Sequence, residues 1–149
     1  MQNLGYACIN MSLSSGPKSK RVTTNRSMIK RTFLQKGKDY AADLALQNLT
    51  DLYTILVWNK NNGINFFRLS SEIFPWASEY DIESLHNYDL ILKAAKKSGD
   101  YAKEHGIRLT SHPGPFNKLC SYKEHVVSNT IRDLEIHGKV FDMIGLDRS

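Results

Sequence analysis

The chain has 149 residues, of which 41% are hydrophobic and 23% charged, with a formal net charge of +5. This composition is typical of one globular domain and excludes a disordered chain, and two cysteines, Cys8 and Cys120, exclude a disulfide framework and are expected to be reduced thiols. Because there is no secretory signal and no apolar run near the roughly 20 residues of a membrane span, we expect a soluble, intracellular protein, cytoplasmic or nuclear according to its host, with no membrane partner.

The first predicted strand is the apolar run at residues 4–9, closed by Asn10 and a loop rich in Ser, Gly and Pro. A basic stretch follows at residues 18–38 and carries Arg21 and Arg26. Two interpretations of this stretch remain open: a solvated loop, or a surface that contacts phosphate groups. The net positive charge is compatible with such a polyanionic partner.

Three predicted helices alternate with two further strands. Apolar residues at three- and four-residue steps predict helices at residues 39–61, 82–105 and 123–145, and the runs at 64–71 and 107–111 predict strands. In the third helix the expected buried stripe is Val126, Val127, Ile131, Leu134, Phe141 and Ile144. The four histidines in or beside these helices, His86, His105, His125 and His137, lack metal-type spacing and are expected to be surface or packing residues.

The element order β-α-β-α-β-α predicts an α/β fold with a parallel sheet and right-handed crossovers, in a single domain over residues 1–149. The 149 residues end directly after the third predicted helix, where a fourth strand would be expected. In folds of this type the loops at the C-terminal ends of the strands carry the chemistry. Candidate site residues are therefore expected at those ends.

His112 stands where the third strand gives way to a Pro-Gly loop, which suits a metal ligand or, alternatively, a hydrogen-bonded loop residue. Pro115 and Phe116 place an aromatic on a stiff loop beside it, for stacking on a nucleobase or for packing. Tyr6 and Asn10, at the end of the first strand, could converge on the same cleft.

Five segments, in order and at natural spacings, resemble the N-terminal half of the UV damage endonuclease family. They are LGYACIN at 4–10, TTNR at 23–26, FFRLSSEIFPWASEY at 66–80, LTSHPGPFN at 109–117 and VVSNTIRDLEIHGKVFDMIGL at 126–146. The resemblance covers nearly the whole chain. It implies a TIM barrel related to the endonuclease IV group, of which about three of eight β/α units are expected here, so that the barrel in this chain is incomplete.

The resemblance also implies an activity, namely metal-dependent incision of UV-damaged double-stranded DNA 5′ to the photoproduct, with divalent ions, commonly manganese. His112 corresponds to a metal ligand, and Glu79 stands where members of the family usually have a metal-binding histidine. Tyr6 and Asn10 match residues near the damaged DNA.

Two further sets of residues are expected to contact the DNA. Pro115-Phe116 replaces a Gln-Tyr pair that probes the damaged bases, so the aromatic ring is kept and the amide is absent. Arg21 and Arg26 are expected to contact the phosphodiester backbone.

Two alternatives remain open beside this endonuclease. The chain could be a non-catalytic DNA-binding fragment, or half of a split enzyme that needs a second polypeptide to complete the barrel, because the remaining metal ligands of the family lie on later strands. It could also be another metal-dependent TIM-barrel enzyme such as a sugar isomerase, which shares the topology without these motifs. Whether the isolated chain is an enzyme is therefore left open.

Overall fold

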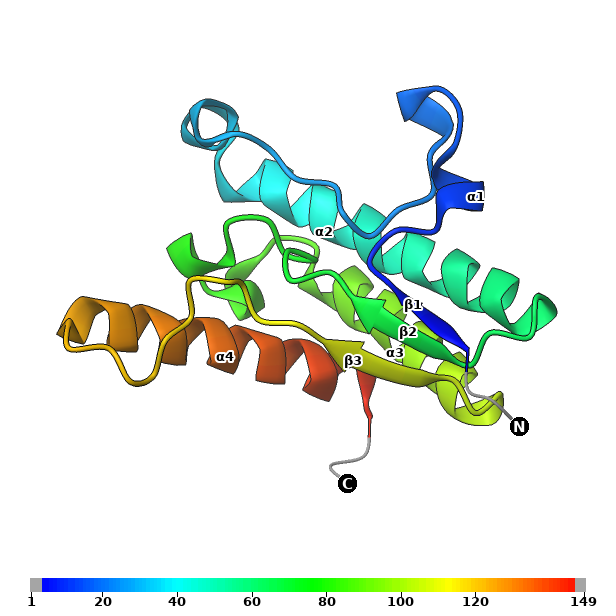
Figure 1. Ribbon diagram of the computed structural model, residues 1–149. Helices are drawn as coiled ribbons and strands as arrows, with labels where there is room; N and C mark the ends of the chain where they lie inside the picture. Colours follow the sequence, from blue (N-terminus) through cyan, green and yellow to red (C-terminus); the bar gives the residue numbers. More distant parts are fainter. Residues whose placement is uncertain (1–3, 147–149) are drawn as a thin grey trace.

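The computed structural model describes residues 4–146, so that residues 1–3 and 147–149 of the expected domain lie outside the described part. Three parallel strands form one sheet in the order β1-β2-β3 (Figure 1). The strands are β1 (Gly5–Ala7), β2 (Phe66–Leu69) and β3 (Arg108–Ser111), and the long helices are α2 (Lys30–Asn61), α3 (Tyr88–Glu104) and α4 (Glu124–Ile144). The short helices are α1 (Met11–Ser14), η1 (Lys18–Lys20), η2 (Ala77–Glu79) and η3 (Ile82–Ser84). The predicted order of strands and long helices is confirmed.

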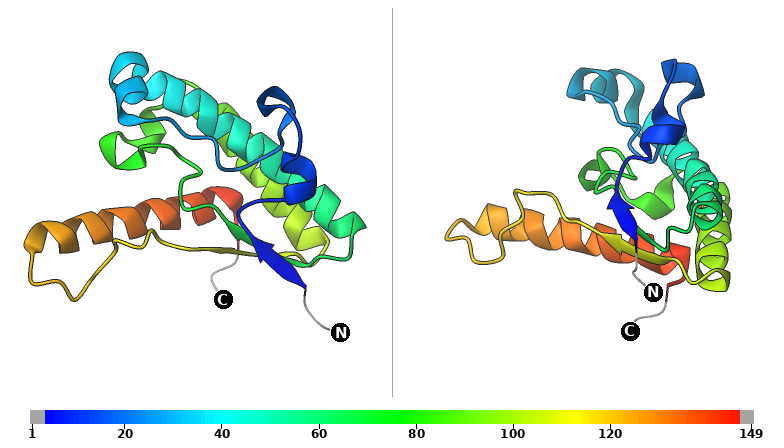
Figure 2. Two further views of the ribbon diagram at one scale, coloured as in Figure 1. Left: turned by 45° about the horizontal axis from the view of Figure 1, so that its top comes forward. Right: turned by 45° about the vertical axis from the view of Figure 1, so that its right-hand side comes forward.

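One face of the sheet is covered by helices. Tyr6, Phe67 and Leu109 are paired across the three strands, and Phe67 and Leu109 are buried. Helices α2 and α3 pack against each other behind this face, and α4 packs beside α3 (Figure 2). The hydrophobic core lies between these layers and draws many of its side chains from α2, including Leu49, Leu52, Ile55 and Leu56.

The opposite face of the sheet is uncovered. It carries Phe66, Arg68 and Arg108, whose side chains line an open hollow of about 540 Å³. The guanidinium carbon of Arg108 lies 5.9 Å from the ring centroid of Phe66. Side chains alternate between the two faces of a strand, so the residues that would fill the interior of a closed barrel are here open to solvent. The sheet is therefore an open one, as the sequence predicts.

A helical segment that the sequence does not predict occupies the second half of the basic stretch and precedes the helix predicted from about residue 39. Helix α2 starts at Lys30, and a kink at Gly37, with φ 69° and ψ −167°, separates residues 30–36 from the rest of the helix. The ring of Phe33 stacks on Trp76 at a centroid distance of 5.4 Å, and Trp76 Nε1 donates a hydrogen bond to the Met28 carbonyl. Packing against a distant loop therefore stabilises a helical turn that the local sequence does not indicate.

The expected buried stripe of α4 holds only in part. Ile131 and Leu134 are 47% and 37% exposed, whereas Thr130 is buried. The first half of α4 extends beyond the strands in Figure 2, and only its C-terminal half, with Val140 and Ile144, reaches the core. The period of the apolar residues predicts the helix correctly, but it does not reveal where the covering layer ends.

Two other expectations concern the whole chain. Cys8 and Cys120 are both free thiols, as expected. Across residues 4–146, none of the helices is both long enough and apolar enough to cross a membrane.

The contact between α3 and α4 generates a stability prediction. A side chain at Gly99 would overlap the backbone carbonyl oxygen of Ile144, so Gly99→Ala must push the two helices apart. We expect the free energy of unfolding to fall by about 1–3 kcal/mol, the usual cost of overpacking a core. Urea unfolding followed by circular dichroism measures it.

Gly138→Ala is the matched control, because Gly138 is exposed in α4 and a Cβ there meets nothing within 4 Å. This variant should gain about 0.5–1 kcal/mol from helix propensity. Equal stability changes in the two variants would contradict the close helix contact.

Candidate functional site

The candidate site lies at the sheet edge where the three strands end. Because the strands are parallel, Asn10, Ser70 and His112 all follow C-terminal ends at the same edge. Neighbouring strands are roughly 4.8 Å apart, so the backbones at the outer strands are separated by only about 10 Å there. The fold therefore brings the predicted site segments together.

Tyr6 and Asn10 belong to a hydrogen-bond chain between β1 and α2. Asn10 Nδ2 donates to the Tyr6 hydroxyl at 2.7 Å, and the Tyr6 hydroxyl donates to Asn59 Oδ1 at 2.6 Å. Asn10 Oδ1 also accepts from the Leu13 backbone amide and so caps α1. Burial raises the pKa of the Tyr6 phenol above its usual value, and the hydrogen bonds from Asn10 and to Asn59 oppose this rise. Both residues thus have a structural task, and their contact with damaged DNA stays a prediction.

His112 is exposed at the first position after β3, and the loop beyond it carries Pro115 and Phe116. The Phe116 side chain is 87% exposed, so it packs against little of the described structure. An exposed aromatic on a loop with two prolines is available for stacking. Stacking of Phe116 on a base and the role of His112 as a metal ligand both stay predictions, and packing of Phe116 remains the alternative.

Helix α4 anchors this loop at both ends. Ser111 Oγ lies 2.7 Å from His137 Nδ1, and His137 Nε2 lies 3.5 Å from Asp133 Oδ2. At the other end Asn117 donates to Asp133, and the Lys118 backbone amide donates to Thr130 Oγ1 at 2.9 Å. The loop that presents His112 and Phe116 is therefore fixed on one helix.

His137 is a residue whose importance the sequence interpretation missed. Its side chain is only 12% exposed and it contacts Ser111, directly before His112. The expectation of a surface or packing residue is therefore incomplete, because the imidazole is part of a polar network. The signal in the sequence is the spacing of Thr130, Asp133 and His137 at steps of three and four, which places polar groups on one face of the helix.

Glu79 is exposed at the end of η2, after the loop that Trp76 holds in place. Trp76 has φ 58°, a left-handed conformation that is uncommon for a bulky residue, and its ring is fixed by Phe33 and Met28. Within residues 4–146, no three His, Cys, Asp or Glu side chains are grouped so as to hold a metal ion. His112 and Glu79 therefore do not form a complete metal centre among the described residues.

The two arginines differ in their surroundings. Arg26 forms an ion pair with Asp51 at 2.6 Å, and its two terminal nitrogens donate to the carbonyls of Thr23 and Arg21 at 2.7 Å. Arg21 is exposed, and its Nε donates to the Gly16 carbonyl. Arg26 thus stabilises the fold of the basic segment, whereas Arg21 faces solvent. The phosphate contacts of both stay predictions.

Known proteins resemble this chain along nearly its whole length. It is 38% identical over 149 residues to a protein of Acanthamoeba polyphaga mimivirus that is named as a UV-damage endonuclease, and 34% identical over 148 residues to the UV-damage endonuclease of Schizosaccharomyces pombe. These matches cover 95% and 97% of this chain, but only 42% and 23% of the two relatives. The chain therefore spans less than half the length of these relatives.

The crystal structure of SacUVDE matches with a TM-score of 0.83 at 28% sequence identity, covering 98% of this chain and 47% of that protein. The open parallel sheet is therefore part of an incomplete TIM-type barrel, as expected. The family described as UV-endonuclease UvdE matches residues 2–149, which sets aside the sugar-isomerase alternative. From this agreement of sequence and fold we conclude that the chain belongs to the UV-endonuclease UvdE family.

Proposed function

We propose that this chain supplies the N-terminal half of an endonuclease that incises UV-damaged double-stranded DNA 5′ to the photoproduct. Its membership of the UvdE family over residues 2–149 carries the proposal. The convergence of three strand ends at one sheet edge supports it, since loops at that edge carry the chemistry of TIM-type barrels. The observation that bears most on substrate is the exposed Phe116 on the loop that follows His112.

Divalent metal ions, with manganese expected, are the cofactors in this proposal. His112 and Glu79 are the candidate ligands, and their exposure leaves both side chains accessible. A hard cation needs about six donors, so the described residues do not fit a complete centre and the other ligands must come from outside them. Bound metal would supply activated water and charge stabilisation at the scissile phosphate.

The DNA contacts are divided between two loops. Phe116 would stack on or beside the lesion, with Pro115 limiting the freedom of the loop. Tyr6 and Asn10 would support the site from the end of β1, where their hydrogen bonds hold the first turn of α1. Arg21 would contact the phosphodiester backbone, and Arg26 would act chiefly by holding Arg21 in place.

The uncovered sheet face favours a second candidate, in which the isolated chain is a non-catalytic DNA-binding fragment or half of a split enzyme. Arg68 and Arg108 lie on that face together with Phe66. Open edges and an exposed face of a parallel sheet are rarely tolerated, which suggests that a second polypeptide or further chain completes the barrel.

His112→Ala tests the proposed metal ligand. We expect Mn²⁺ to bind the wild-type chain when it is joined to a complementing half that supplies the remaining ligands, and to broaden the NMR signals of the His112 imidazole first, because a paramagnetic ion acts on its ligands most strongly. Affinity should fall by about tenfold or more in His112→Ala, since removal of even an indirect metal partner has that effect. His125→Ala, an exposed histidine of α4, is the control. Equal affinities in the two variants would remove His112 from the metal site.

Phe116→Ala tests the interaction with the lesion. Stacking on a base is worth about 1–3 kcal/mol, so the preference for irradiated over intact duplex should fall by a factor of roughly 5 to 150. Fluorescence anisotropy with paired oligonucleotides measures the ratio of the two affinities. Tyr122→Ala is the control, because Tyr122 is a fully exposed aromatic farther along the same loop. A ratio that stays at the wild-type value in Phe116→Ala would assign Phe116 no role at the lesion.

The isolated chain is expected not to incise DNA even with abundant manganese, because the described residues supply too few ligands to fix a metal cluster. It should also oligomerise through its open sheet edges. An irradiated oligonucleotide assay with a chelator control, and a sizing column, test both points. Chelator-sensitive nicking 5′ to the lesion by a monodisperse monomer would show that these residues suffice.

A further inference from the structure

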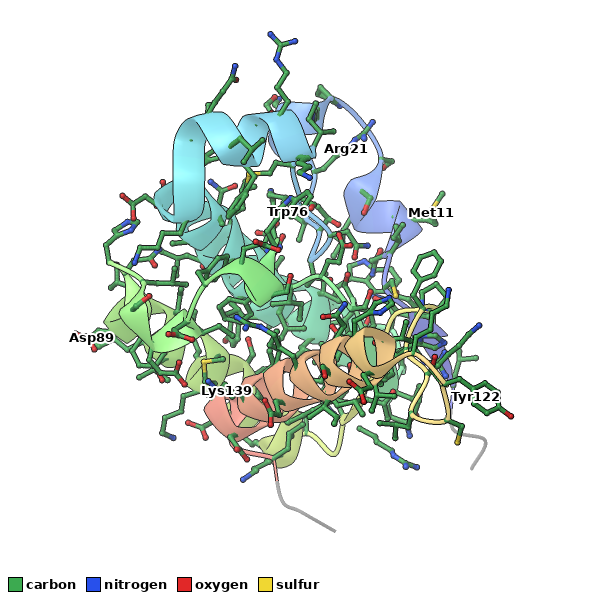
Figure 3. All side chains as sticks on the ribbon, turned by 90° about the vertical axis from the view of Figure 1, so that its left-hand side faces the viewer. Met11, Arg21, Trp76, Asp89, Tyr122 and Lys139 are labelled. Atoms are coloured by element: carbon green, nitrogen blue, oxygen red, sulfur yellow. The ribbon has the colours of Figure 1, made fainter. Side chains whose placement is uncertain are left out.

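A groove of about 730 Å³ lies between the segment at residues 9–27 and helix α2, outside the site at His112. Its volume is in the range of about 300–1,000 Å³ that ligand sites occupy. The residues on which its chemistry depends are Ile9, Met11, Lys18, Arg21 and Tyr40. In Figure 3, Met11 and Arg21 both lie in the upper part of the molecule, well away from Lys139 on α4.

The charge of the groove is of one sign. Among the described residues that line it, Lys18, Arg21 and Arg26 are cationic and none is a carboxylate, and because Arg26 is paired with Asp51, Lys18 and Arg21 carry the free charge. The imbalance extends along the sequence, because the first acidic residue of the whole chain is Asp39, whereas Lys and Arg recur from Lys18 to Lys38. Such a concentration of one sign of charge attracts polyanions.

The groove is held open by hydrogen bonds from α2. Asp51 pairs with Arg26 and accepts from the Thr23 backbone amide at 2.9 Å, so the carboxylate that contacts the groove wall is neutralised. Asn48 bonds both the amide and the carbonyl of Arg26, at 3.0 and 3.1 Å. The wall that carries Arg21 is therefore fixed before any ligand binds, so that less conformational entropy is lost on binding.

The walls of the groove are apolar and aromatic. Ile9 and Met11 are 47% and 77% exposed, which is unusual for two large apolar side chains in one hollow. Tyr40 lies on the α2 side, and Lys36 Nζ is 4.3 Å from the centroid of its ring. Cations that follow a phosphate backbone, combined with a ring on which bases stack, are the features of sites for single-stranded nucleic acid.

We propose that this groove binds an unpaired DNA strand regardless of damage, with phosphates at Lys18 and Arg21 and a base between Met11 and Tyr40. Ile9 follows β1 at the same sheet edge that presents His112 after β3, so one strand could pass from the candidate lesion site into the groove. The inference rests on the proposed function for its choice of DNA, and it adds an affinity that requires no photoproduct.

The test measures binding of a fluorescein-labelled, undamaged twelve-residue thymidine oligonucleotide to the full chain by anisotropy, over a series of salt concentrations. Arg21→Glu should lower affinity at least tenfold and reduce the slope of log affinity against log salt by about 0.7 for each phosphate that Arg21 neutralises. Lys93→Glu, the same charge reversal at an exposed position on α3, should change affinity less than twofold. Lys18→Glu is a second groove variant, which serves if circular dichroism shows Arg21→Glu to be unfolded.

Tyr40→Leu separates stacking from charge. It should weaken binding roughly 5- to 150-fold while leaving the salt slope unchanged, because it removes a ring and no cation. Tyr53→Leu is the control, because Tyr53 packs on Tyr101 of α3 instead of lining the groove.

The outcomes distinguish the groove from the lesion site. If Arg21→Glu and Lys18→Glu bind the oligonucleotide as tightly as the wild type and keep the preference for irradiated duplex, the proposed groove site is overturned. The proposed function is then unaffected. A second outcome is that these variants lose oligonucleotide binding while the wild-type chain shows no preference for irradiated duplex. This outcome supports the groove and contradicts the proposed function. Displacement of the oligonucleotide by a glutamate peptide of equal length and at equal concentration identifies a site for acidic proteins, and overturns the proposal.

Discussion

The buried amide of Asn48 joins the two segments on which the candidate site depends. Its oxygen accepts from the Arg26 amide, and its nitrogen donates to the carbonyls of Arg26 and Ile73 at 3.1 and 3.0 Å. A fully buried amide costs stability unless such partners are present, and here one side chain of α2 fixes both the basic segment and the loop after β2. The positions of Arg21 and of Trp76 both follow from this contact, because each lies within a few residues of the bonded backbone.

The sequence predicts the order of strands and helices because that order depends on local periodicity, and it predicts His112 at a strand end for the same reason. It does not predict the helical turn at residues 30–36, because the Phe33 ring packs on Trp76, more than forty residues away. It also misses the network of Asp133 and His137, since the spacing places these polar groups on one face of α4 but does not say that this face meets the loop after β3. Contacts between distant segments are what a single sequence conceals.

The two arginines show the same limit at the level of chemistry. Arg21 and Arg26 are equivalent in the sequence, five residues apart in one basic stretch. In the fold, Arg26 pairs with Asp51 and bonds two carbonyls, while Arg21 remains at the surface. Only Arg21 has a charge that a polyanion can bind without breaking an ion pair that stabilises the fold. A basic stretch therefore contains both structural and binding cations, and burial separates them.

The uncovered sheet face connects the fold to the proposed activity. Arg68 and Arg108 alternate along β2 and β3 with the buried Phe67 and Leu109, so whatever closes the barrel must cover two guanidinium groups. Burying them without acceptors would cost several kcal/mol per charge, so the covering segment must supply carboxylates or carbonyls. The same parallel strands end at His112 and Asn10. A further parallel strand in the same sheet would have its C-terminal end at that edge, so in the proposed function closure of the barrel and completion of the site would occur together.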